Sequence, residues 1–157
     1  SSDPYGRCTL WKEGAVLMER SKQLRYLRIA LRVVGLIFIF GLFLMMAVWP
    51  AGWTWEPRQS EYEQMMMGIY ATLGVFLLIA SRDPMAHKSL IWFTIVSSLV
   101  HGGIMAAQAI ADPADRANLF GDVPALFAVA IVLAALMPQG AFAEQAFKVK
   151  NQRVTNE

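Results

Sequence analysis

The third long apolar stretch of the chain, residues 89–111, contains polar side chains suited to ligand binding or proton exchange. Ser97, His101 and Gln108 recur at steps of four and seven residues, which places them on one face of a helix. An imidazole exchanges protons near neutral pH, and ionisable side chains inside apolar helices commonly mark functional sites. We therefore expect a polar face, centred on His101, that looks toward other helices.

Two other apolar stretches supply polar residues that can meet this face. Tyr70 lies inside the second stretch with Glu63 seven residues before it on the same face, and Asp122 opens the fourth stretch. Together with His101 and Gln108 they predict one inward-facing pocket toward the outer surface. Such a pocket suits a quinone, a lipid or another apolar molecule, with His101 as the central hydrogen-bonding or proton-exchanging group.

Each of these residues also has a purely structural explanation. Glu63 fits a capping box with Ser60, in which each side chain satisfies a free backbone N–H at the start of a helix. Asp122 can cap the fourth helix, and the other three can hydrogen-bond across helices. Both interpretations stay open for the ligand-binding candidates, which are His101, Tyr70, Gln108, Glu63 and Asp122.

No recognised reaction motif accompanies these residues. The sequence has no H-E-x-x-H, no C-x-x-C, no phosphate-binding glycine loop and no G-x-S-x-G. The single cysteine, Cys8, excludes a disulfide or a cysteine-based zinc site within one chain. We predict no metal, no resident cofactor and no enzymatic activity. A quinone, or a porphyrin-type ring on His101 with room left by Gly102 and Gly103, is the minor alternative.

Four apolar stretches predict membrane-spanning helices. Of the 157 residues, 56% are hydrophobic and 17% are charged, a composition that disfavours disordered chains, disulfide scaffolds and nucleic-acid binders. A bilayer core about 30 Å thick needs roughly 20 apolar helical residues. The predicted fold is all-α, an integral membrane four-helix antiparallel bundle over residues 27–137, with spans at 27–49, 61–81, 89–111 and 119–137.

The positively charged residues predict the orientation of these spans. All but two of the 14 lysines and arginines fall before or at the start of the first span, between the second and third, or after the fourth; the exceptions are Arg58 and Arg116. The positive-inside rule then places both termini in the cytoplasm. We predict that residues 1–26, with a basic amphipathic lead-in suited to anionic lipid, and residues 138–157 are cytoplasmic segments of an inner-membrane protein.

Small residues and tryptophans predict how the helices pack and how they sit in the bilayer. Small residues repeat every four positions in the third span, which lets helices approach closely, either within the chain or against another subunit. Tryptophans of the first outer connection are expected at headgroup level. The packing residues are Ser98, Gly102, Gly103, Ala106 and Ala107, and the interface anchors are Trp49, Trp53 and Trp55.

A family resemblance is carried by WPAGWTWEP, SEYEQMMMGIYATLGVFLLIASRDP, SLIWFTIVSSLVHGGIMAAQA and LFGDVPALF. Over about residues 45–130 these stretches resemble a bacterial family of small four-span membrane proteins of unknown function. More loosely, their layout is similar to that of DoxX-like proteins. The resemblance implies the four-span fold and a bacterial inner membrane, and it implies no activity. The positions that match its pattern include the five ligand-binding candidates.

Two functions follow from these observations. The first is a non-enzymatic accessory or structural subunit of a larger membrane complex, whose partners are the lipid bilayer and other membrane subunits. The missing reaction motifs, the small soluble parts and the small-residue repeat of the third span favour it. The alternative is a membrane protein that binds a small apolar ligand around His101 in the outer leaflet, with a quinone-linked redox role as an extension.

Overall fold

The computed structural model describes residues 4–54 and 60–138, and within these ranges it contains helices and no strands. The all-α class predicted from the sequence is confirmed. The elements are α1 (Pro4–Leu36), η1 (Ile37–Gly41, a π-helical turn), α2 (Leu42–Val48), η2 (Pro50–Gly52, 3-10), α3 (Ser60–Ala80), α4 (Lys88–Ala111), η3 (Pro113–Leu119, 3-10) and α5 (Asp122–Leu136).

Three helical stretches are long and apolar enough to cross a membrane, namely Met18–Val48, Lys88–Ala111 and Pro113–Leu136. A shorter apolar helix covers Gln64–Ala80 within α3. The four predicted spans fall on these helices. The helix that carries the first span begins earlier, at Pro4, so the basic lead-in and the span form one continuous helix.

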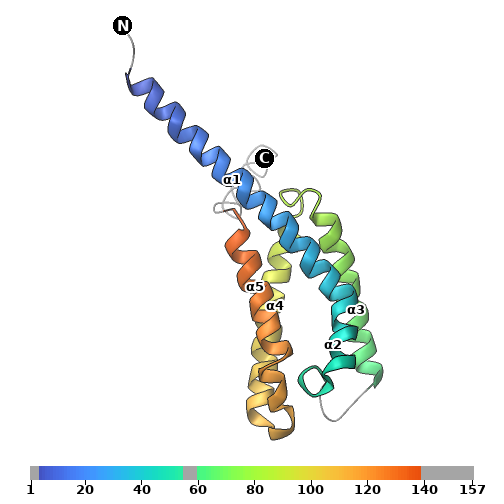
Figure 1. Ribbon diagram of the computed structural model, residues 1–157. Coiled ribbons are helices and arrows are strands. Elements are labelled where there is room, and N and C mark those ends of the chain that lie inside the picture. The colour runs from blue at the N-terminus through green and yellow to red at the C-terminus, as the bar shows by residue number, and fades with distance from the viewer. Residues whose placement is uncertain (1–3, 55–59, 139–157) are drawn as a thin grey trace, which may run out of the picture.

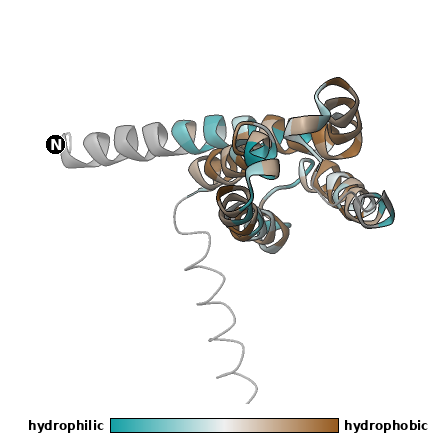
Figure 2. Ribbon diagram, turned by 90° about the horizontal axis from the view of Figure 1, so that it is seen from below, coloured by the Kyte–Doolittle hydropathy of each residue, from teal (hydrophilic) through white to brown (hydrophobic). Residues whose placement is uncertain are grey.

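Large apolar side chains cover the outer faces of the helices. Phe40, Ile69, Phe93, Ile110 and Ile131 are each more than half exposed, and they come from every apolar helix. In Figure 2, among the residues that are not grey, hydrophilic ones are concentrated on the part of α1 that extends beyond the bundle. A monomer in water rarely exposes so much contiguous apolar surface. This surface and the helix lengths indicate a membrane protein.

The helices pack as two pairs. Figure 1 shows α3 beside the long helix made by α1, η1 and α2, and α4 beside α5. The chain passes alternately from one end of the molecule to the other, so the start of the bundle and the end of α5 lie together (Figure 1). There the Gln23 amide donates hydrogen bonds to the carbonyl oxygens of Ala135 and Met137, at 3.5 and 3.4 Å.

The buried core joins the two pairs in one half of the molecule only. Leu27 and Leu31 of α1 are fully buried together with Leu77 of α3, Ile91 of α4 and Leu133 of α5. All of them lie in the half that contains the connection between α3 and α4. Toward the other end the pairs diverge (Figure 1). The polar residues singled out from the sequence lie in that diverging half.

Two glycines set the spacing of the first pair. A Cβ atom on Gly74 would lie 2.6 Å from the carbonyl oxygen of Gly35, and one on Gly35 would lie 2.8 Å from that of Gly74. Real Cβ atoms do not approach a backbone oxygen so closely. The backbones of α1 and α3 therefore touch, in the manner of small-residue contacts between membrane helices.

We predict that Gly74→Ala destabilises the protein, because the added methyl group must push α1 away from α3. The expected cost is about 1–3 kcal/mol, typical of overpacking. Gly68→Ala on the same helix is the matched control, since a Cβ there meets nothing within 4 Å. Thermal unfolding in detergent, followed by helical circular dichroism, checks this. Equal midpoints for the two variants would contradict the close contact.

Candidate functional site

A cavity of about 670 Å³ lies between the diverging helix pairs. Its walls come from η1, α2 and α3 on one side and from α4, η3 and α5 on the other. Most of the lining is apolar, including the methionines Met46, Met66, Met67 and Met105. Methionine side chains are flexible and polarizable, so walls of this kind adapt to the shape of what they contact.

Four of the five ligand-binding candidates line this one cavity. Tyr70 projects from α3, His101 and Gln108 from α4, and Asp122 from the first turn of α5. His101 and Gln108 reach it together because seven residues are two turns of one helix. The backbone of Glu63 belongs to α3, but its side chain lies outside the described residues, as does its predicted capping box.

Three rings form a row at the inner end of the cavity. Phe38 of η1 meets Tyr70 edge-to-face, with ring centroids 5.1 Å apart and planes at 74°. Tyr70 in turn meets His101 with centroids 5.9 Å apart and planes at 85°. The row connects the α1–α3 pair to α4 at the edge of the apolar core, to which Phe38 itself belongs. Its first member sits in a π-helical turn, and such turns are frequent at functional sites.

Three aspartates from the segment that links α4 to α5 also line the cavity. Asp112 follows α4, Asp115 lies in η3, and Asp122 begins α5. Asp115 and Asp122 are buried, with 6% and 7% of their surfaces exposed. The Asp112 carboxylate accepts a hydrogen bond of 2.9 Å from the backbone N–H of Ala114, so it also caps η3. Among the described residues no lysine or arginine lines the cavity.

The connection after α2 and the connection between α4 and α5 meet beside these aspartates. The Asn118 amide donates a 3.1 Å hydrogen bond to the carbonyl oxygen of Thr54. A Cβ on Gly121 would overlap the carbonyl oxygen of Gly52, so η2 is in backbone contact with the turn between η3 and α5. Trp53, in the same connection as Thr54, lines the cavity.

The three predicted interface anchors therefore differ in environment. Trp49 is exposed, with 42% of its surface accessible, as an anchor at headgroup level would be. Trp53 is half-buried and faces the cavity, because the contact between the outer connections turns it inward. Trp55 lies outside the described residues. The anchoring role of Trp53 stays a prediction, and its place in the cavity lining is an addition that the sequence did not indicate.

The small residues of α4 also divide by environment. Ser98 and Gly102 are buried, and a Cβ on Gly102 would lie 3.3 Å from the Cβ of Leu126, so this side packs against α5. Ala106 is half-buried. Gly103 and Ala107 are exposed, and a Cβ on Gly103 would meet nothing within 4 Å. Packing within the chain therefore uses the first side and not the second.

Sequence reasoning missed Asp112, Asp115 and the cavity-facing role of Trp53. The Asp-Pro pair at Asp112 marked a helix boundary and nothing more. One signal was available, since three aspartates fall within eleven residues at the outer end of two apolar helices. Among the described residues, no group of three or more His, Cys, Asp or Glu side chains is arranged to hold a metal ion.

The model of one known family matches most of the chain. Residues 21–153 match the model of a family of unknown function (DUF6632). The chain belongs to this family. The match contains every residue that lines the cavity, from Ile37 to Val129. Searches of curated proteins and of solved structures each found no match. The predicted resemblance to an uncharacterised family is confirmed, while a DoxX-like layout and a bacterial origin stay predictions.

We predict that the ring contact between Tyr70 and His101 stabilises the bundle. A double-mutant cycle with His101→Ala and Tyr70→Leu should give a coupling energy of about 0.5–1.5 kcal/mol, the usual range for edge-to-face pairs. Unfolding midpoints in detergent measure it. His87→Ala with Tyr70→Leu is the control cycle, because His87 lies in the turn before α4 and should show no coupling. Equal coupling in both cycles would contradict the contact.

Proposed function

We propose that this chain is a four-span membrane protein without enzymatic activity, which binds a small apolar or amphiphilic molecule in the cavity between its helix pairs. The observation that carries the proposal is the cavity of about 670 Å³ lined by Tyr70, His101, Gln108 and Asp122. Ligand sites typically measure about 300–1,000 Å³ and combine an apolar lining with a few converging polar groups. This cavity has both properties.

The packing of the cavity walls supports binding over a purely structural network. A network that only joins helices places its polar groups in direct contact, and the surrounding side chains fill the space. Here the polar groups surround a space that the methionines and aliphatic side chains leave open. Quinones and lipid chains are ligands of suitable size and polarity. His101 supplies the central hydrogen-bonding group, beside the ring of Tyr70.

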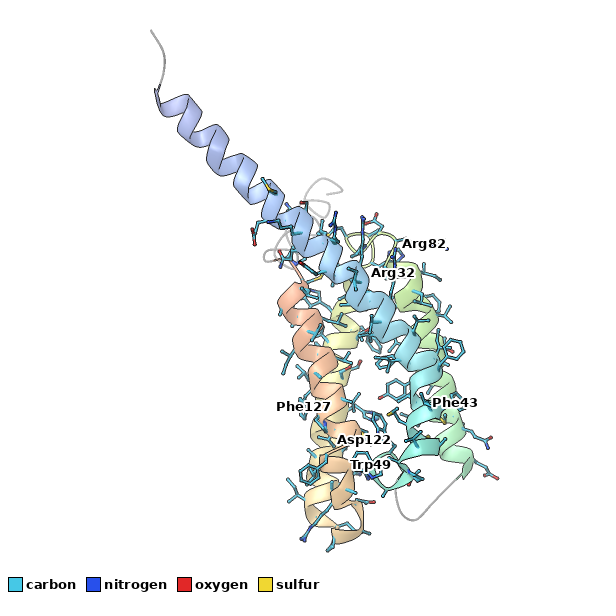
Figure 3. All side chains as sticks on the ribbon, viewed as in Figure 1. Arg32, Phe43, Trp49, Arg82, Asp122 and Phe127 are labelled. Atoms are coloured by element: carbon cyan, nitrogen blue, oxygen red, sulfur yellow. The ribbon has the colours of Figure 1, made fainter. Side chains whose placement is uncertain are left out.

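The proposed location is a bacterial inner membrane, with both termini in the cytoplasm and the cavity toward the outer leaflet. The distribution of basic residues supports this orientation. Arg32 and Arg82 lie at the end of the molecule opposite Asp122 (Figure 3). The cavity then opens in the half of the protein farthest from the cytoplasm.

A cavity-filling substitution tests the proposed function. Ala125→Trp places a large ring where Ala125 lines the cavity, whereas Ala128→Trp on the same helix points to the exposed face. In lipid nanodiscs an uncharged photoreactive adamantyl diazirine should label cavity residues saturably in the wild type and in Ala128→Trp. Ala125→Trp should lose this labelling, as mass spectrometry of the peptides would show.

The labelling pattern can also contradict the proposal. If Ala125→Trp keeps the saturable component, or if the label spreads evenly over the lipid-facing helices in every variant, the cavity does not bind apolar molecules. Helical circular dichroism of both tryptophan variants verifies that each remains folded.

Cysteine accessibility tests the orientation. The single native thiol, Cys8, should react with a membrane-impermeant maleimide only after spheroplasts are lysed, because the N-terminal segment is proposed to be cytoplasmic. In a Cys8→Ser background, Ala114→Cys in the exposed part of η3 should react in intact spheroplasts. The reverse pattern would invert the proposed topology.

A second candidate function is an accessory subunit of a larger membrane complex. The exposed side of α4 at Gly103 and Ala107 favours it, because small residues open to the surface let another helix approach closely. Purification in mild detergent should then yield a stoichiometric partner that Gly103→Leu loses. Gly68→Leu, at another open glycine on α3, should retain it. A chain that purifies alone would argue against this role.

A further inference from the structure

The charges that line the cavity are of one sign. Asp112, Asp115 and Asp122 contribute carboxylates, and no described lysine or arginine lines the cavity. Arg116 belongs to the same connection as Asp115, but it is exposed and is not part of the lining. A cleft with low-dielectric walls and charges of one sign concentrates the electric field of those charges, and it therefore attracts ligands of the opposite charge.

The carboxylates all come from the segment that links α4 to α5. Asp112 lies about three helical turns beyond His101 of the ring row, whereas Asp122 lies about one turn before Leu126, which packs beside Gly102. Methionine and aliphatic side chains also line the cavity. The cavity is therefore amphiphilic, with its carboxylates on the side of the α4–α5 connection, the acidic end, and methionine and aliphatic side chains in its apolar body.

Burial strengthens the effect of two of these charges. Asp115 and Asp122 are 6% and 7% exposed, so water screens them far less than it screens surface carboxylates. A ligand cation placed here gains more attraction than it would at an exposed carboxylate.

Aromatic faces accompany the carboxylates. Trp53 lines the same end of the cavity, from the outer connection that contacts η3, and Tyr70 lies deeper. Aromatic rings attract organic cations through their negative faces, tryptophan most strongly. Since the described residues form no metal-binding group of three His, Cys, Asp or Glu side chains, an organic cation fits this end better than a metal ion does.

We propose that the ligand is a cationic amphiphile, whose amine or quaternary ammonium group lies among Asp112, Asp115 and Asp122 and whose apolar body occupies the methionine-lined part of the cavity. This inference rests on the proposed function and adds the charge of the ligand. A free lipophilic amine and the ethanolamine headgroup of a phospholipid share this chemistry.

A pair of probes with nearly the same shape and opposite charge tests the inference. The full chain is placed in phosphatidylglycerol nanodiscs, and equilibrium binding of tetraphenylphosphonium and tetraphenylborate is measured with empty nanodiscs subtracted. Saturable binding of the cation should exceed that of the anion by about tenfold or more. Asp122→Asn and Asp115→Asn should each reduce this preference several-fold, because each removes one buried charge from the acidic end.

Asp83→Asn is the matched control for the charge change. Asp83 is exposed in the turn between α3 and α4, where its carboxylate caps the backbone N–H groups of Met85 and Ala86, and it does not line the cavity. It should leave the preference unchanged. The comparison of the two probes on the wild-type chain needs no variant, so the test stands even if an aspartate variant fails to fold.

Equal binding of both probes, preference for the anion, or saturable binding of neither probe would overturn the inference. The adamantyl diazirine experiment decides separately whether the cavity binds apolar molecules, because that label is uncharged. Repeating the cation titration in phosphatidylethanolamine nanodiscs separates the two ligand sources. Weaker binding there identifies the lipid headgroup as the occupant, and unchanged binding identifies a free amine.

Discussion

The backbones of α1 and α3 touch at Gly35 and Gly74, and the shape of the molecule depends on this contact. Each glycine faces the carbonyl oxygen of the other at a distance that a side chain would forbid. On the other side of the molecule, Gly102 lets α4 approach Leu126 of α5. Each pair is therefore tight within itself. The pairs join each other through larger side chains, such as Leu31 and Ile91, in one half of the bundle. The remaining half stays open as the cavity.

The placement of polar groups follows from this geometry. Polar side chains in an apolar bundle are costly unless they find partners or face a cavity. His101 and Tyr70 lie where the core ends, and their rings close the inner end of the open half. Asp115 and Asp122 lie on either side of Gly121, whose backbone contacts Gly52 of η2, and both are buried. The apolar walls of the cavity limit the size of a ligand, and the polar side chains among them determine where its polar groups can bind.

Much of the candidate site was predictable from residue types alone. His101, Tyr70, Gln108 and Asp122 stand out because each is polar within an apolar stretch, and helical periodicity places the two α4 residues on one face. Asp115 was not predictable in the same way. It lies in a connection, and the direction of a side chain in a connection depends on backbone turns and tertiary contacts that no periodicity describes. The place of Trp53 in the cavity lining was not predictable for the same reason.

The sequence by itself determined the helical class, the approximate ends of the apolar helices and the residues that must avoid lipid, because hydrophobicity and helical period are local properties of the chain. Only the tertiary structure decided which helices form pairs. Sequence neighbours α3 and α4 could have packed as a hairpin, yet α3 packs mainly on α1 and α4 mainly on α5. That choice depends on the mutual fit of distant small residues such as Gly35 and Gly74, which no local pattern reveals. The cavity exists because of that choice.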